Sequence, residues 1–103
     1  MKSTIERKVY DTDTATLVAG DESVIGTGDF QWWAEALYLT AKGSWFLFGR
    51  GGGMTRYADH QDGHSSEGEK IIPMTRLEAL AWCEEHHAQE AIDQHFGDMV
   101  EDA

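Results

Sequence analysis

Two apolar segments on either side of Lys42-Gly43 constrain this chain more than any other feature. The stretch from Trp33 to Arg50 reads WAEALYLTAKGSWFLFGR, with bulky apolar and aromatic side chains in both halves. Glycine as the second residue of a tight turn tolerates the positive φ that hairpin turns require. The stretch therefore predicts an antiparallel β-hairpin at the centre of the fold.

A two-residue loop at Lys42-Gly43 would fix the register of this hairpin. The expected pairs are Leu39 with Phe46, Leu37 with Phe48, Tyr38 with Leu47, Thr40 with Trp45, and Glu35 with Arg50. Side chains alternate between the faces of a strand, so one face would carry four apolar side chains, those of Leu37, Leu39, Phe46 and Phe48. A hairpin alone is marginally stable in water, so this face needs a cover.

The sequence that follows Pro73 supplies a candidate cover. Thr75 and Glu78 match the capping box of a helix N-terminus, and the helix should run to about His86 or His87. At 100° per residue its apolar arc contains Leu77, Leu80, Ala81 and Cys83, and Trp82 falls beside that arc. A second helical segment places Ala88, Ala91, Ile92 and Phe96 on one side, with Gly97 as its stop.

Shorter elements complete the expected fold. Residues Met1–Tyr10 favour a short strand, Ala15–Ala19 favour a short helix capped by the preceding Asp and Thr residues, and Ala58–Glu69 favour an exposed loop. Lys70–Ile72 reads as a strand that Pro73 ends or confines to a sheet edge. We therefore expect an α+β fold, an antiparallel β-sheet built on the central hairpin and packed against C-terminal helices.

Length and charge limit the class of protein. A chain of 103 residues is expected to form a single domain, residues 1–103, and its one cysteine excludes an internal disulfide. No apolar run approaches the roughly 20 residues that span a bilayer, and no signal peptide is recognisable, so we expect a cytoplasmic protein. A formal net charge of -11 repels nucleic acid and anionic membrane, so direct contact with either is not expected. The same charge attracts basic protein surfaces.

The C-terminal end of the chain carries acidic residues without any Lys or Arg. Every Lys and Arg lies at or before Arg76, whereas the rest of the chain holds only acidic charges. Like charges four residues apart on a helix cost a few tenths of a kcal/mol each, roughly, so this segregation has no evident structural benefit. It is compatible with a merely solvated face or with a surface that imitates a phosphate backbone. The expected partner-binding residues are Glu78, Glu84, Glu85, Glu90, Asp93, Asp98 and Trp82.

Other site patterns are incomplete. Cys83 and His87 have the i, i+4 spacing that zinc or a thiol nucleophile could use, but a structural zinc needs four ligands and the chain has no second Cys. Gly51–Gly53 lacks the remaining residues of a phosphate-binding loop and instead favours a sharp turn or close approach of another segment, with Met54 and Tyr57 folding back onto the sheet. We expect no catalytic residues, no metal and no cofactor.

Three blocks of the sequence resemble a known group of proteins. KVYDTDTA near the start, LYLTAKGSWFLFGRGGGMTRYA in the middle, and EKIIPMT followed by a helix of the pattern EA…W…EHH…EAI…F resemble small acidic proteins of bacterial phages, plasmids and integrative elements. The resemblance covers most of the chain except 21–28 and the loop around 60–68. Some small acidic proteins of mobile elements are anti-CRISPR inhibitors, which implies a bacterial host cell as the location.

Two functions are compatible with these observations. The first is an anti-CRISPR-like, non-enzymatic inhibitor that binds a basic nucleic-acid-binding surface of a CRISPR-Cas effector by DNA mimicry. The second is an interaction or regulatory module of a mobile element that docks through an aromatic face made by Trp32, Tyr38 and Trp45, in one form as a homodimer.

Overall fold

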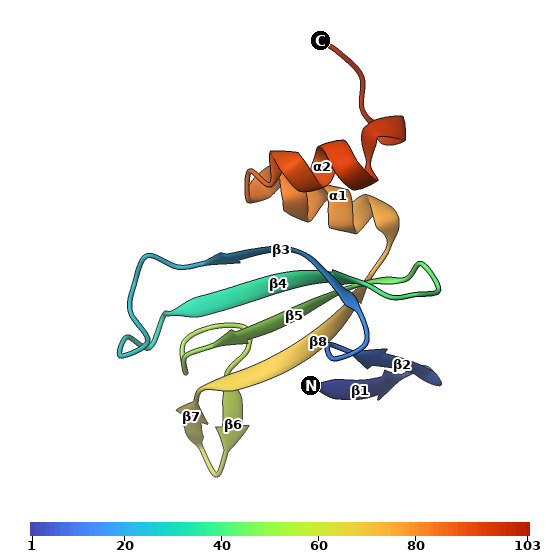
Figure 1. Ribbon diagram of the computed structural model, residues 1–103. Coiled ribbons are helices and arrows are strands. Elements are labelled where there is room, and N and C mark those ends of the chain that lie inside the picture. The colour runs from blue at the N-terminus through green and yellow to red at the C-terminus, as the bar shows by residue number, and fades with distance from the viewer.

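A four-stranded antiparallel sheet in the order β3-β4-β5-β8 forms the body of the protein (Figure 1). The computed structural model describes all 103 residues. The sheet strands are β3 (Thr16–Glu22), β4 (Trp33–Leu39), β5 (Trp45–Gly51) and β8 (Gly68–Met74). The helical elements are α1 (Arg76–Glu85), α2 (Gln89–His95) and the short 3-10 helix η1 (Gly97–Met99). Two separate hairpins are formed by β1 (Lys2–Ile5) with β2 (Lys8–Asp11) and by β6 (Asp59–Gln61) with β7 (His64–Ser66). The α+β class and the packing of C-terminal helices on a sheet are confirmed.

The central hairpin exists, but its predicted register is wrong by one residue. Thr40 and Ser44 close the loop, with the Thr40 N–H donating to the Ser44 carbonyl at 2.8 Å, so the loop has three residues and Gly43 adopts a φ of 89°. The Thr40 hydroxyl also accepts from the Ser44 N–H at 3.0 Å. The observed pairs are Ala34 with Arg50, Glu35 with Gly49, Ala36 with Phe48, Leu37 with Leu47, Tyr38 with Phe46, and Leu39 with Trp45. These hydrogen bonds stabilise the three-residue loop, in which Gly43 has a left-handed backbone conformation.

A shift of one residue moves one strand's side chains to the other face of the sheet. Leu37 and Leu47 consequently lie together under the helices, whereas Phe46 lies on the opposite face. The core under the helices contains Leu37, Trp45, Leu47, Ala79, Leu80, Trp82, Cys83, Ala91, Ile92 and Phe96. The opposite core contains Tyr10, Phe46 and Ile71, and partly buried Ile5, Ala15, Tyr38 and Phe48 pack against it. The sheet is therefore covered on both faces, by α1 and α2 on one and by the β1–β2 hairpin on the other.

Helix α1 begins as the sequence predicts. The Thr75 hydroxyl accepts from the Glu78 N–H, and the Glu78 carboxylate accepts from the Thr75 N–H at 2.8 Å, which completes the capping box. The predicted apolar arc is wrong at two positions, because Leu77 is 66% exposed and Ala81 is also exposed, whereas Trp82 is only 5% exposed. Small Ala79 and Cys83, both fully buried, let the helix approach the sheet on the side that carries Trp82. Leu77 is left on the solvent side.

Three shorter predictions have mixed outcomes. The expected helix over Ala15–Ala19 is wrong: these residues enter β3, where Thr and Val suit a strand, and β3 pairs with β4 through a bulge between Leu17 and Ala19. The expected loop over 58–69 contains the exposed β6–β7 hairpin, turned by Asp62-Gly63 with both φ angles positive. Strand β8 is an edge strand, as Pro73 requires.

No helix of the protein is long and apolar enough to cross a membrane.

The segment after β5 folds back over one half of the helix-facing side of the sheet. Tyr57 is 2% exposed, and its ring lies where a side chain at Gly49 would be. A Cβ at Gly68 would similarly overlap the backbone carbonyl of Tyr57. The predicted return of Tyr57 onto the sheet is confirmed, whereas Met54 is 67% exposed and does not return. Glycines in adjacent strands therefore create the space that Tyr57 fills.

We expect Gly49→Ala to lower the free energy of unfolding by about 1–3 kcal/mol, the usual cost of overpacking a filled site. The new methyl group would occupy the position of the Tyr57 ring, which is held on its other sides. Chemical denaturation followed by tryptophan fluorescence measures the effect. Gly28→Ala is the matched control, because nothing lies within 4 Å of a Cβ at Gly28. Equal stability of the two variants would contradict this account of Gly49.

Candidate functional site

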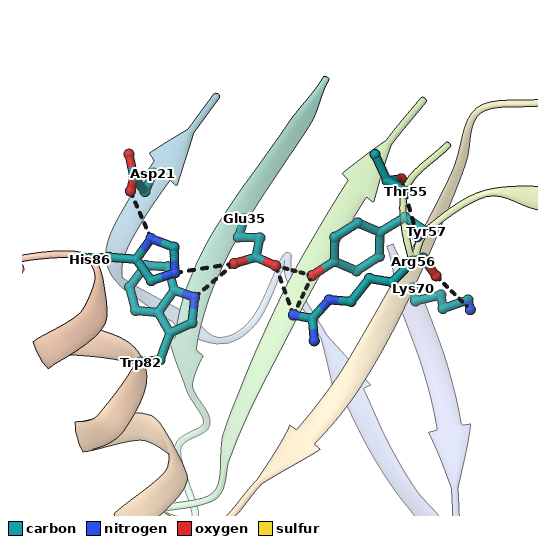
Figure 2. A network of polar contacts seen from close by, with 8 residues as sticks. All are labelled: Asp21, Glu35, Thr55, Arg56, Tyr57, Lys70, Trp82 and His86. Carbon is teal, nitrogen blue, oxygen red and sulfur yellow. Dashed lines mark hydrogen bonds and ion pairs between the residues drawn. The ribbon is translucent and has the colours of Figure 1, made fainter. Parts of the chain in front are cut away.

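A single carboxylate, that of Glu35, joins three parts of the protein (Figure 2). Glu35 points from β4 toward the helices, and its side chain is only 10% exposed. Its Oε2 accepts from Arg56 Nη2 at 2.7 Å and from the Tyr57 hydroxyl, and its Oε1 accepts from Trp82 Nε1 at 2.9 Å. The network therefore ties the sheet, the segment after β5 and helix α1 to one another. Glu35 does not pair with Arg50 as predicted, because the observed register places Gly49 opposite Glu35.

His86 extends the network to the edge of the sheet. Its Nε2 lies 3.5 Å from Glu35 Oε1, and its Nδ1 lies 2.7 Å from Asp21 Oδ2 on β3. Its ring stacks on Trp82 with a centroid distance of 4.3 Å and meets Trp33 edge-on at 5.7 Å. His86 thus bridges two carboxylates, and Figure 2 shows its ring against that of Trp82.

The hydrogen bonds change the acid-base properties of these groups. Burial alone raises the pKa of Glu35, but hydrogen bonds from Tyr57, Trp82 and Arg56 together outweigh burial and hold that pKa below its ordinary value of 4.5. Burial and the hydrogen bond to Glu35 raise the pKa of Tyr57 far above its ordinary value of 10.0. The hydrogen bond with His86 lowers the pKa of Asp21. Near neutral pH Glu35 is therefore a carboxylate held by three donors, which makes it a structural acceptor and a poor proton donor.

An open cleft of about 740 Å³ runs beside this network. Its walls are one flank of α1 and the segment 54–57, and Glu35 lies at its floor. The lining residues are Gln31, Trp33, Glu35, Met54, Thr55, Arg56, Tyr57, Met74, Glu78, Ala81, Trp82, Glu85 and His86. The polar groups of the network already bond one another, so they offer few free donors or acceptors to a ligand in the cleft.

The expected partner-binding residues do not form one surface. Glu84 and Asp93 line a second groove of about 730 Å³ between α1, α2 and the C-terminal tail, together with Glu101 and Asp102. Glu78 and Glu85 instead line the cleft beside Glu35. Glu90 lies toward β3, in a third depression. We call the first group, Glu84, Asp93, Glu101 and Asp102, the acidic groove.

Four of the expected residues, Asp98, Trp82, Glu78 and Asp93, are engaged within the chain. The Glu78 carboxylate accepts from the Thr75 N–H, and Asp93 Oδ1 accepts from Gln89 Nε2 at 2.9 Å. Asp98 forms a bidentate ion pair with Arg76 at 2.5 and 2.9 Å, and this hydrogen bonding lowers the pKa of Asp98. Trp82 is buried and donates to Glu35, so its role is to hold α1 on the sheet. By contrast, none of the residues of the acidic groove forms an ion pair.

The aromatic docking face of the second hypothesis is absent from the surface. Trp32 and Trp45 are 7% and 6% exposed, and Tyr38 stacks on Phe46 with a centroid distance of 5.2 Å, beneath the N-terminal hairpin. Trp45 packs against Phe96 of the helical layer. Covers on the two faces of the sheet therefore enclose Trp45 and Tyr38, and Trp32 is also buried.

Cys83 lies in the core beneath α1 and is fully buried. Burial raises the pKa of its thiol, which opposes formation of the thiolate that nucleophilic chemistry and metal binding need. No group of three or more His, Cys, Asp or Glu side chains is arranged to hold a metal ion.

Comparisons of the chain with protein-family models, with curated proteins and with solved structures give no match.

Sequence reasoning missed the Glu35 network, although one signal for it was present. Glu35 alternates with Trp33, Leu37 and Leu39 on the same face of one strand, so the face that buries those residues also buries a carboxylate. A buried carboxylate requires donors. The donors Tyr57 and Trp82 lie 22 and 47 residues away, and no local pattern connects them with Glu35.

We expect Glu35→Gln to lower the free energy of unfolding at neutral pH by about 2–3 kcal/mol, since a hydrogen bond to a charged group contributes roughly 1.5–3 kcal/mol. The variant should also change the pH dependence. In the wild type the folded-state pKa of Glu35 is lower than the unfolded one, so its stabilisation is complete above about pH 4.5 and disappears as the pH falls through the folded-state pKa.

Urea denaturation between pH 3 and pH 7 measures both effects. Glu35→Gln should lose part of the acid-dependent decline, whereas the control Glu22→Gln, at an exposed residue of β3 without an ion pair, should keep the wild-type profile. An identical decline in the wild type and Glu35→Gln would show that Glu35 does not carry this stabilisation.

Proposed function

We propose that this protein is an anti-CRISPR-like inhibitor that acts without catalysis, by binding a basic nucleic-acid-binding surface of a CRISPR-Cas effector. The acidic groove is the contact surface in this proposal. The observation that carries it is the convergence of Glu84, Asp93, Glu101 and Asp102 on one groove without a compensating ion pair.

Electrostatics favours this surface over the rest of the acidic residues. A charge already paired inside the chain attracts a partner weakly, so Asp98 contributes less than the sequence suggested. Exposed, unpaired carboxylates retain their full charge and steer a basic partner toward the groove. Keeping like charges together costs some stability of the folded chain, and a partner with the opposite charge relieves that repulsion.

A phosphate backbone presents negative charges on a surface that offers no positive charge. The acidic groove is similar, since no Lys or Arg lines it and His87 is the one basic residue among its lining side chains. The surrounding surface of α1 and α2 adds Glu85 and Glu90, which are exposed. These features support mimicry of a nucleic-acid ligand by the helical layer.

The double variant Glu84→Lys with Asp93→Lys should weaken inhibition at least about tenfold, because close interfacial charge pairs contribute roughly 1.5 kcal/mol or more and 1.4 kcal/mol is a factor of ten. The assay is target-DNA cleavage by a panel of purified CRISPR-Cas effectors of different types, titrated with the protein. The matched control, Asp59→Lys with Glu67→Lys, makes the same change of net charge near the exposed β6–β7 hairpin.

Ionic strength provides a second readout of the same mechanism. For any effector that is inhibited, the inhibitory concentration should rise steadily with added salt. Inhibition that is insensitive to salt, or equal loss in the two charge-reversal variants, would exclude the acidic groove as the contact surface. Absence of inhibition across the panel would reject the proposed function.

A further inference from the structure

Half of the basic residues of this acidic protein gather around one groove. The groove has a volume of about 800 Å³ and lies between the β1–β2 hairpin and the loop that joins β4 to β5. The basic residues that line it are Lys2, Arg7, Lys8 and Lys42, four of the eight in the chain. Lys2, Arg7 and Lys8 lie within the first eight residues, and folding brings the distant Lys42 to them, so the net charge of the chain conceals the cluster.

The cationic side chains of this basic groove are free of partners within the chain. None of the four forms an ion pair. Asp11 is the only acidic residue that lines the groove, and its carboxylate accepts from the Asp13 N–H at 2.9 Å. The groove consequently has an excess of positive charge that is exposed to solvent.

Polar groups of the backbone and of side chains lie among the cations. Strand β2 pairs only with β1, so one of its edges is open. The Thr12 N–H donates to the Met1 carbonyl, so Met1 and Thr12 form a hydrogen-bonded pair. In an antiparallel ladder such pairs alternate with pairs that are not hydrogen-bonded. Val9 and Thr4 form a pair of the second kind, so the N–H of Val9 points away from β1. Three hydroxyl side chains, those of Thr14, Thr40 and Ser44, also line the groove.

We propose that the basic groove binds the phosphodiester backbone of a nucleic-acid strand. Lysine, arginine, hydroxyl and backbone N–H groups are the groups that contact phosphates and sugars in protein–nucleic-acid complexes. Four cations line a groove much larger than one phosphate, which suits a row of phosphates. Tyr10 is buried, so no aromatic platform for base stacking is present and the binding should be independent of sequence.

The net charge of -11 opposes this binding only at long range. The β1–β2 hairpin packs on the sheet face opposite to α1 and α2, and Figure 1 shows the two at opposite sides of the sheet. Two layer spacings of about 10 Å separate them, whereas the Debye length is about 8 Å at physiological ionic strength. Salt therefore screens the acidic helices from a ligand in the basic groove. The whole-chain charge predicted no direct contact with nucleic acid, and the basic groove is the exception that we infer.

The test is fluorescence anisotropy of a labelled single-stranded oligonucleotide titrated with the full chain, without any effector. Binding at 50 mM salt should weaken by about 50-fold at 200 mM, the change expected when roughly four phosphates are neutralised on a single strand. Lys8→Gln with Lys42→Gln should reduce affinity at least tenfold. Arg50→Gln with Lys70→Gln, which changes the net charge equally outside the groove, should not.

Competitors distinguish a nucleic-acid strand from other anions. An unlabelled oligonucleotide should displace the labelled strand at far lower concentration than inorganic phosphate or an acidic peptide of equal charge. Displacement by inorganic phosphate at the same concentration of phosphate groups would indicate a single-phosphate site, and equal displacement by the acidic peptide would indicate a peptide site. Either result would overturn the proposal, as would absence of binding at 50 mM salt or equal loss in the two double variants. Thermal unfolding of each variant confirms that it is folded.

Discussion

The buried carboxylate of Glu35 is the interaction on which the arrangement of this protein depends. Helices cover one half of the sheet face, the segment after β5 covers the other half, and Glu35 lies where these two covers meet. A carboxylate in this position would be costly without donors, and each cover supplies one, Trp82 from α1 and Tyr57 from the segment. Both covers must dock before the charge is satisfied. The network therefore makes the packing of α1 depend on the packing of a segment distant from it in sequence.

Local signals in the sequence predicted where the helices and strands lie better than they predicted which side chains of each element face the core. The capping box at Thr75 and Glu78 located the start of α1, because both partners lie within one turn of helix. The hairpin was also evident, but one residue of loop length decides which side chains face the helices. That length follows from the hydrogen bonds between Thr40 and Ser44 and the left-handed Gly43, a choice that the apolar pattern does not encode.

A candidate site could be predicted only where its residues lie close together in the sequence. The acidic C-terminal segment is continuous in sequence, so its charge was evident, although folding pairs Asp98 with Arg76 and disperses the other residues over several surfaces. Three cations of the basic groove, Lys2, Arg7 and Lys8, are close in sequence, but their approach to Lys42 depends on the docking of one hairpin against another, which no local pattern shows. Trp82 was grouped with exposed residues because its donor role needs Glu35, which lies 47 residues away.

The covers on the two faces of the sheet also keep the cations of the basic groove apart from the carboxylates of the acidic groove. A small protein with free lysines and free carboxylates on one surface would pair them, and surface pairs contribute little to stability while they remove charge from both sites. Here the sheet and its two apolar cores lie between the β1–β2 hairpin and the helices, so cations on one side cannot reach carboxylates on the other. The same layers that bury Phe46 and Leu47 on opposite faces thus preserve a basic groove and an acidic groove as separate surfaces. A partner that presents both a basic protein surface and a nucleic-acid strand would match both at once, whereas either one alone would use only half of the charged surface.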